Sequence, residues 1–335
     1  MNVTEKRMLV IRFSALGDVA MTIPAIYSLA EKYPQLHIDV VTRPFFARLF
    51  INPPSNVTVH GIDLNNRYKG VRGTLRLLKY LRNLKPDYVA DLHNVLRTWV
   101  IDRYFKLRNV KVEMVDKLRK NRKDILKKGI SQPNFINRYV EVFSRLGYLV
   151  NLNFNSLFDD TQREHPVEIN HPAIGIAPFA RYYNKTYPPA MMKETVDLLT
   201  AKGYNVYLFG GRGKEAEELA HWQAGNDRCI SLAGRFTLEE ELALMGEMDL
   251  MVSMDSANQH MAALAGTKVL SIWGSTTPAC GFLGYHQTED NALYLNIECQ
   301  PCTVAGSPEC PLGHLNCLNG ITPQSIVNKI ESFVG

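Results

Sequence analysis

The chain has no long hydrophobic run, because no stretch approaches the roughly 20 apolar residues that a membrane-spanning helix requires. Its N-terminus also lacks the charged and then apolar pattern of a secretory signal, so we expect a cytoplasmic protein. A disordered chain is excluded, since 46% of the residues are hydrophobic. With 335 residues, the chain is long enough for two domains that each have a core.

The first strand-to-helix turn lacks the G-x-G-x-x-G pattern of dinucleotide-binding folds, which disfavours NAD binding at this turn. An apolar run at residues 8–13 predicts a strand, and the helical spacing at 19–33 predicts a helix. The turn between them ends at Asp18, so this carboxylate is expected at the carboxyl edge of a sheet, where ligands bind. Asp18 is a candidate general base, with an ordinary helix cap as the alternative.

Short apolar runs that alternate with helical stretches predict two doubly wound α/β domains. Strands are expected at 8–13, 38–42, 57–62, 88–92, 173–177, 205–209, 250–253 and 269–273. Residues 151–170 are rich in Asn, Asp and Pro and are the candidate linker. We expect domains at 1–165 and 166–335, with a helix at 323–334 that packs across either of them.

Three strand ends of the second half carry candidate ligand-binding residues. The turn Gly210-Gly211-Arg212-Gly213 precedes Glu215 and suits a nucleotide, although glycine-rich turns are common without one. The run Asp255-Ser256-Ala257 opens a helix that contains His260, and its amides suit a diphosphate. Lys185 is a candidate charge for the same group. The alternatives are helix capping, an interior histidine and a surface lysine.

Four of the six cysteines crowd one stretch near the C-terminus, and two stand apart. Cys299, Cys302, Cys310 and Cys317 have the spacing C-x2-C-x7-C-x6-C. In a cytosolic chain this spacing allows a tetrahedral zinc site, with reduced buried thiols as the alternative.

Positive charge is concentrated in residues 117–128, although the whole chain carries only +5. This segment has seven basic residues and one acidic residue. We expect it to meet an anionic partner, with a solvated helix face as the alternative.

The motifs together resemble the ADP-heptose:lipopolysaccharide heptosyltransferases of glycosyltransferase family nine. The resemblance is carried in order along the whole chain by Arg12 to Asp18 with Pro24, Lys185 to Pro188, Leu232 to Gly234, Asp255-Ser256 with His260, and Trp273 to Pro278. The chain departs from the family pattern at Ala257, where glycine is usual. A Cβ there narrows the approach to a phosphate and puts the donor pose in doubt.

The resemblance implies a GT-B fold, in which two Rossmann-like domains face each other across a cleft. It implies that Asp18 is the catalytic base, that Lys185 lies at the donor phosphates with the Asp255-Ser256 turn under the diphosphate, and that an acid near Glu215 binds the nucleoside. Ala257 and His260 are further donor-binding candidates. Glu217 and Glu218 are alternatives for that acid. The Cys-rich tail resembles the second heptosyltransferase type.

We therefore expect an inverting, metal-independent transfer of heptose from an ADP-sugar to a lipopolysaccharide-type glycolipid, with no required cofactor. Ser14, Lys120 and Arg122 are assigned to the acceptor. The partners expected are the nucleotide-sugar donor, the anionic glycolipid and, peripherally, the inner membrane surface, but no nucleic acid. A nucleotide-sugar 2-epimerase and a non-catalytic nucleotide-sugar-binding protein are the alternatives.

Overall fold

Two parallel β-sheets organise the chain, one in each of two units. The computed structural model describes residues 6–128, 130–158 and 164–335, except for the side chains of Arg122, Lys123 and Lys127. Unit 1 consists of Met1–Arg119 and Phe135–Leu157, and unit 2 of Lys120–Asn134 and Phe158–Gly335.

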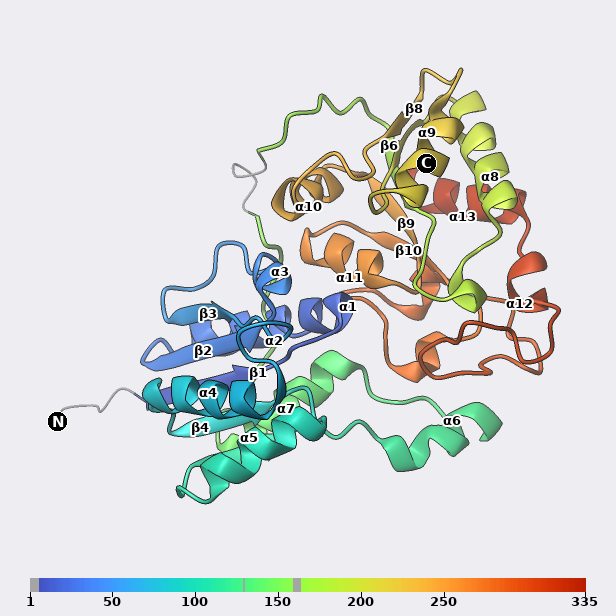
Figure 1. Cartoon of the computed structure of the whole chain (residues 1–335). Coiled ribbons are helices and arrows are strands. Elements are labelled where there is room, and N and C mark those ends of the chain that lie inside the picture. Colours follow the sequence, from blue (N-terminus) through green and yellow to red (C-terminus); the bar gives the residue numbers. More distant parts are fainter. Residues whose placement is uncertain (1–5, 129, 159–163) are drawn as a thin grey trace. The chain divides into compact units, whose positions relative to one another are not determined.

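Unit 1 has five parallel strands in the order β3-β2-β1-β4-β5, which is a Rossmann-type order. The strands are β1 (Lys6–Ile11), β2 (Leu36–Thr42), β3 (Val57–Gly61), β4 (Tyr88–Asp91) and β5 (Lys111–Met114). The helices are α1 (Leu16–Ala20), α2 (Ile23–Lys32), α3 (Pro44–Ala47), α4 (Gly70–Asn83), α5 (Leu96–Lys106) and α7 (Phe135–Leu146). Figure 1 shows α4 and α5 in front of this sheet, and α2 packs with α7 on the other face.

Unit 2 has six strands in the order β11-β10-β9-β6-β7-β8, which repeats the same topology with a sixth strand. The strands are β6 (Ala173–Ala177), β7 (Asn205–Leu208), β8 (Cys229–Ser231), β9 (Leu250–Met254), β10 (Val269–Ile272) and β11 (Ala292–Leu293). Its helices are η1 (Arg119–Asn121, which begins at the last residue of unit 1), α6 (Arg122–Lys128), η2 (Tyr183–Lys185), α8 (Pro189–Ala201), α9 (Lys214–Gln223), α10 (Leu238–Gly246), α11 (Ala257–Leu264), η3 (Pro278–Cys280), η4 (Glu289–Asn291), α12 (Asn316–Asn319) and α13 (Pro323–Val334).

The expected α/β class and all eight expected strands are confirmed, but the first helix is not continuous. The expected helix at 19–33 divides into α1 and α2, because Thr22 turns its hydroxyl onto the carbonyl of Val19 and Pro24 opens the second helix. A proline is tolerated in the first turn of a helix, where its missing N–H has no partner to lose.

The units divide earlier than the sequence suggests. Residues 151–157 are not a linker, because Phe154 is buried against Tyr27 and its amide donates to Ser28. Residues 159–163 of the expected linker lie outside the described residues. The C-terminal helix α13 packs on α8 within unit 2, and Lys202 and Glu331 form an ion pair between them.

Residues 120–134 were expected in the first domain, but they pack with the second. The amide of Gln132 donates to the carbonyl of Ala279, and the side chain of Asn134 donates to the carbonyl of Leu283. This segment has few apolar residues, so its sequence contains no pattern that would reveal which unit it packs on.

Candidate active site

Unit 1 collects its chemically active side chains at the carboxyl ends of β1 and β4. These two strands are neighbours, and the chain leaves them in opposite directions, so a crevice for a ligand is expected between their ends. The loop from Arg12 to Asp18 follows β1, and the loop from Leu92 to Asn94 follows β4. The sequence identified the first loop and missed the second.

The Asp18 carboxylate accepts a backbone hydrogen bond and forms an ion pair at the start of α1. One carboxylate oxygen accepts a hydrogen bond from the amide of Ala15 at 2.9 Å, which is one of the two bonds of a capping box, because the Ala15 side chain has no acceptor for the other. The other oxygen forms an ion pair of 2.7 Å with Arg12, a buried side chain that also donates to the carbonyl of Leu92 at 2.6 Å. The cap expected as the alternative to catalysis is therefore present, and Arg12 fixes the direction of the carboxylate.

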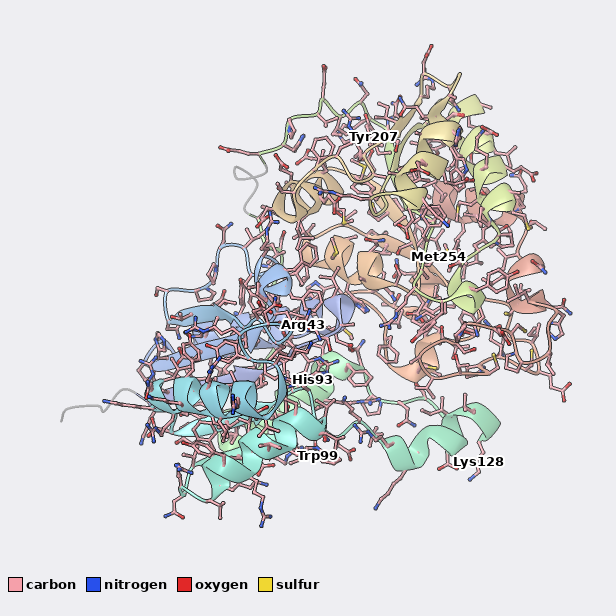
Figure 2. The ribbon with its side chains drawn as sticks, viewed as in Figure 1. Arg43, His93, Trp99, Lys128, Tyr207 and Met254 are labelled. Atoms are coloured by element: carbon pink, nitrogen blue, oxygen red, sulfur yellow. The ribbon has the colours of Figure 1, made fainter. Side chains whose placement is uncertain are left out.

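His93 is the main residue of this edge that the sequence did not reveal. Its Nε2 lies 3.4 Å from the hydroxyl of Ser14, and its ring meets Phe13 edge to face. Burial, followed by the charges of Arg12 and Lys117, lowers the pKa of His93 to about 3, so the ring is neutral near pH 7. Its buried Nδ1 has no hydrogen-bond partner among the described residues. A neutral imidazole therefore stands beside the Asp18 loop (Figure 2).

The basic segment contributes to this edge through residues other than those expected. Lys117 is half-buried, and desolvation together with the nearby charges of Arg12 and Arg119 lowers its pKa to about 8. Arg119 donates to the carbonyl of Asn94 at 2.8 Å. Lys120 belongs to unit 2 and is exposed, and the side chain of Arg122 lies outside the described residues. Unit 1 thus places Arg12, Lys117 and Arg119 at the carboxyl ends of β1 and β4. We call this part of unit 1 the active edge.

Two buried carboxylates lie under the loop after β4. Asp91 accepts hydrogen bonds from the amides of His93 and Asn94, and these bonds shape the loop. Asp102 on α5 is almost fully buried, and its desolvation, then the charge of Asp91, raises its pKa well above the ordinary range. The pair is therefore expected to hold a proton at pH values where an exposed aspartate has lost it.

This proton makes the stability of the protein depend on pH. The folded state retains it while the unfolded state releases it above pH ~4, so the free energy of unfolding falls as pH rises, by about 1.4 kcal/mol per pH unit for one proton. We expect Asp102→Asn to remove this contribution, so that the difference between variant and parent grows between about pH 5 and 7. Urea unfolding curves over this range measure it.

Asp87→Asn is the matched control. The pKa of Asp87 is lowered: burial raises it, but its hydrogen bonds with Lys6 and Arg7 lower it by more. Between about pH 5 and 7, the free energy of unfolding of Asp87→Asn is expected to change with pH in the same way as that of the parent. Parallel curves for Asp102→Asn as well would show that Asp102 is ionised in the folded protein.

Unit 2 repeats the arrangement at the ends of β6 and β9, which are also neighbours. Lys185 ends η2 after β6, and Asp255 follows β9. The ammonium and carboxylate form an ion pair of 2.7 Å, with side-chain exposures of 13% and 4%. Thr276 donates to the same carboxylate oxygen at 2.6 Å, and Gln259 donates to the other at 3.0 Å. A carboxylate with three donors thus orients the lysine, which is not a surface residue.

The diphosphate candidates Ser256, Ala257 and His260 all lie at or near the start of α11. Ser256 caps the helix by accepting a hydrogen bond from the amide of Asn258 at 3.3 Å, and Ala257 is its first residue. The start of an eight-residue helix favours an anion through its amides and its dipole. His260 is buried, and its role as a donor ligand stays a prediction.

The glycine turn after β7 is held by one of the three candidate acids. Glu215 accepts a hydrogen bond from the amide of Gly211 at 2.7 Å, whereas Glu218 accepts one from the indole of Trp222 at 2.9 Å. The sequence missed Glu241 on α10. Its desolvation raises its pKa to about 7, and the charge of Arg212 in the glycine turn limits the rise. Two acids therefore interact with this turn: Glu215 binds the amide of Gly211, and Glu241 interacts with the charge of Arg212.

The Cys-rich tail packs against Lys185. The amides of Cys302 and Thr303 donate to the carbonyl of Ser275, and a Cβ on Gly306 would come within 2.5 Å of Cδ of Lys185. The tail thus lines the stem of the lysine and helps to hold it beside Asp255.

The thiols of this tail are reduced and close to one another. All six cysteines are unpaired, and burial followed by the neighbouring thiols raises the pKa of Cys317 to about 11. Within the described residues, however, no three His, Cys, Asp or Glu side chains converge as ligands of a metal ion. The structure therefore does not arrange Cys299, Cys302, Cys310 and Cys317 as the zinc site that their spacing allows.

In chemical terms, unit 1 presents an oriented carboxylate beside a neutral imidazole and three cations, whereas unit 2 presents a lysine and a helix start suited to a diphosphate. Within the described residues, no helix is long and apolar enough to cross a membrane.

Solved structures of similar proteins agree on the fold. The structure matches the Escherichia coli ADP-heptose lps heptosyltransferase II with a TM-score of 0.71 and 20% identity over 98% of both chains. It matches the Escherichia coli heptosyltransferase WaaC with ADP with a TM-score of 0.69 and 18% identity, over 97% of this chain and 99% of that one. The expected GT-B fold, with its two Rossmann-like units, is confirmed.

Sequence comparisons define the family. The family model "Glycosyltransferase family 9 (heptosyltransferase)" matches residues 74–312. The curated "Lipopolysaccharide heptosyltransferase 3" of Escherichia coli is 27% identical over 78% of this chain and 81% of its own length. The chain belongs to glycosyltransferase family 9, the heptosyltransferases, and it is a sugar-transferring enzyme.

Proposed function

We propose that the protein transfers a heptose from an ADP-heptose donor to an anionic, lipopolysaccharide-type acceptor, with inversion at the anomeric carbon. The observation that carries the proposal is that each unit has a polar site at the carboxyl ends of two neighbouring strands. In unit 1 this site holds the oriented carboxylate of Asp18, and in unit 2 it holds the Lys185–Asp255 pair beside the start of α11. Relatives and structural neighbours named as lipopolysaccharide and ADP-heptose heptosyltransferases support the identity of both substrates.

In this proposal, Asp18 accepts the proton of an acceptor hydroxyl. The hydroxyl oxygen attacks the anomeric carbon, and the bond from that carbon to the diphosphate oxygen breaks, so that ADP leaves with the electron pair. Lys185 and the amides of α11 stabilise the charge that develops on the diphosphate, a contribution of about 3–4 kcal/mol for one such donor in other enzymes. No step is routed through a metal ion or another cofactor.

The nucleoside is assigned to the turn after β7. Glu215 fixes this turn through the amide of Gly211, and Glu241 interacts with the charge of Arg212 in the same turn. We assign the anionic groups of the acceptor to Lys117 and Arg119, which lie near the Asp18 loop in unit 1, and we keep Lys120 and Arg122 as acceptor candidates. Ser14 remains an acceptor candidate. We place the reaction at the cytoplasmic side of the inner membrane.

A transfer assay separates this function from its alternatives. Purified protein is incubated with ADP-heptose, with and without lipopolysaccharide from a strain that lacks core heptose, and both donor and acceptor are analysed by mass spectrometry. We expect a heptose added to the acceptor and ADP released only when the acceptor is present. An epimerase changes the donor without acceptor, and a binding protein releases no ADP in either case; either result would contradict the proposal.

A further inference from the structure

Most of the large hydrophobic side chains exposed in unit 1 lie on two neighbouring helices. They are Val71 and Leu75 on α4, and Leu96, Trp99, Val100 and Leu107 on or directly after α5, with exposures from 42% to 80%. On α5 they recur at intervals of three and four residues, so they share one face of the helix, while Ile101 and Phe105 are buried on the other. This is an outward apolar stripe in addition to the one that packs on the sheet.

Five of the six apolar residues lie in the first two turns of α4 and α5, whereas Leu107 follows the far end of α5. Both helices follow strands of a parallel sheet, and so both begin at its carboxyl edge. Arg97 donates to the carbonyl of Tyr68 just before α4, and buried residues of both helices share one core. Figure 1 shows α4 beside α5, and Figure 2 labels Trp99 near the start of α5. Asp18 lies at the same edge of unit 1.

Basic side chains surround these apolar residues. The exposed ones are Arg72, Arg76, Lys79 and Arg82 on α4, and Arg103, Lys106 and Arg108 on or after α5. None of them forms an ion pair within the part of the chain that the structure describes. The only acidic residue of the two helices is Asp102, which is buried. The surface is therefore most apolar where the two helices begin and is positively charged over its length.

We propose that this surface, the α4–α5 face, docks on an anionic lipid bilayer. Basic residues attract anionic headgroups, whereas Trp and aliphatic side chains enter the boundary between headgroups and acyl chains. A nucleic acid would leave the apolar side chains of Val71 and Leu96 without an apolar partner, although they are 80% and 75% exposed. A dimer formed through this face would bring the basic side chains of the two copies together, and they would repel each other. The role rests on the proposed function: a lipid-anchored acceptor stays in the membrane while its sugar reaches the edge that carries Asp18.

Trp99 reports on docking directly. The chain has three tryptophans, and the other two, Trp222 and Trp273, are 4% and 0% exposed. Protein is titrated with vesicles of phosphatidylglycerol and phosphatidylcholine, or of phosphatidylcholine alone, without nucleotide or acceptor. We expect a blue shift of the emission and quenching by lipids with brominated acyl chains, only with phosphatidylglycerol. The Trp99→Phe variant is expected to lose this fluorescence change but still to sediment with the vesicles. Binding weakens as salt rises above about 0.1 M, where the Debye length is about 10 Å.

Two sets of substitutions separate the charged and apolar contributions. Arg72→Gln with Arg76→Gln and Lys79→Gln is expected to lower vesicle partitioning by about fivefold per charge and to flatten its salt dependence. Leu96→Ser with Val100→Ser lowers partitioning as well but leaves the salt dependence unchanged. Lys32→Gln with Leu149→Ser is the matched control, because these two exposed side chains flank Tyr33 beside α2, away from the α4–α5 face.

All variants are first checked for parental urea unfolding curves, which test the fold of unit 1, the unit that carries the substitutions. Several results would overturn the proposal: no partitioning of the parent at low salt, partitioning that neither set changes, equal competition by short duplex DNA, or a dimer that Leu96→Ser with Val100→Ser dissociates. Vesicle binding requires no sugar transfer, so a protein that docks but does not transfer heptose would refute only the proposed function.

Discussion

Asp18→Asn is expected to lower the rate of sugar transfer by about 100- to 10,000-fold, because an amide does not accept the proton of the acceptor hydroxyl. The affinity for ADP should stay at the parental value, since the nucleotide is assigned to unit 2. The amide oxygen of asparagine still accepts the hydrogen bond from Ala15, so the cap on α1 is kept. Single-turnover kinetics and calorimetry with ADP measure the two effects.

The same substitution also breaks the ion pair with Arg12, and this needs a separate control. Arg12→Met breaks that pair while it retains the carboxylate. If Asp18 is the base, this variant keeps far more activity than Asp18→Asn, because only the orientation of the base is lost. Equal losses in both variants would instead assign Asp18 a structural role. A sugar-transfer rate of Asp18→Asn within a few fold of the parental rate would also assign Asp18 a structural role.

Seven of the eight strands that the sequence revealed lie in the middle of the sheets, and only β3 lies at an edge. Both faces of a central parallel strand are buried, which gives a continuous apolar run such as Ala173–Ala177. The three strands that were missed, β5, β8 and β11, lie at sheet edges, and two of them have only three and two residues. An edge strand needs less apolar burial, so its sequence resembles that of a loop.

Candidate site residues were found where they follow a predicted strand, as Asp18, Lys185 and Asp255 do. Contacts between strand ends were not found, because Ser14–His93 and Lys185–Asp255 depend on which strands are neighbours. Single-sequence patterns give the strands but not their order. Had the Rossmann order been assumed, His93 would have been found, since it follows the strand that neighbours β1 at the switch point.

The basic segment shows a second limit. Its charge was visible, but its division between the two units was not, because that division rests on contacts of Gln132 and Asn134 with residues far away in the sequence. Charge density predicts that an anionic partner approaches, whereas the fold decides which cations are near the active edge. Here these are Lys117 and Arg119.

Lys185→Ala is expected to weaken the binding of ADP on the order of 10- to 100-fold and that of adenosine hardly at all. A hydrogen bond to a charged group contributes about 1.5–3 kcal/mol, and only ADP carries the phosphates that receive it. Calorimetry with both ligands measures the difference. Lys193→Ala is the matched control, since Lys193 is another lysine of unit 2 but pairs with Asp197 on the surface of α8.

The lysine also has a structural role, which a second variant separates from binding. Lys185→Ala leaves the buried carboxylate of Asp255 without its cation, and breaking such a pair costs about 3–5 kcal/mol of stability. The cost should fall below this range because Thr276 and Gln259 still donate to Asp255. Adding Asp255→Ala removes the unpaired charge, so the double variant should regain stability in urea unfolding without regaining affinity for ADP. If it recovered ADP affinity together with stability, or if Lys185→Ala weakened ADP and adenosine equally, Lys185 would support the fold of the site and would not bind the diphosphate.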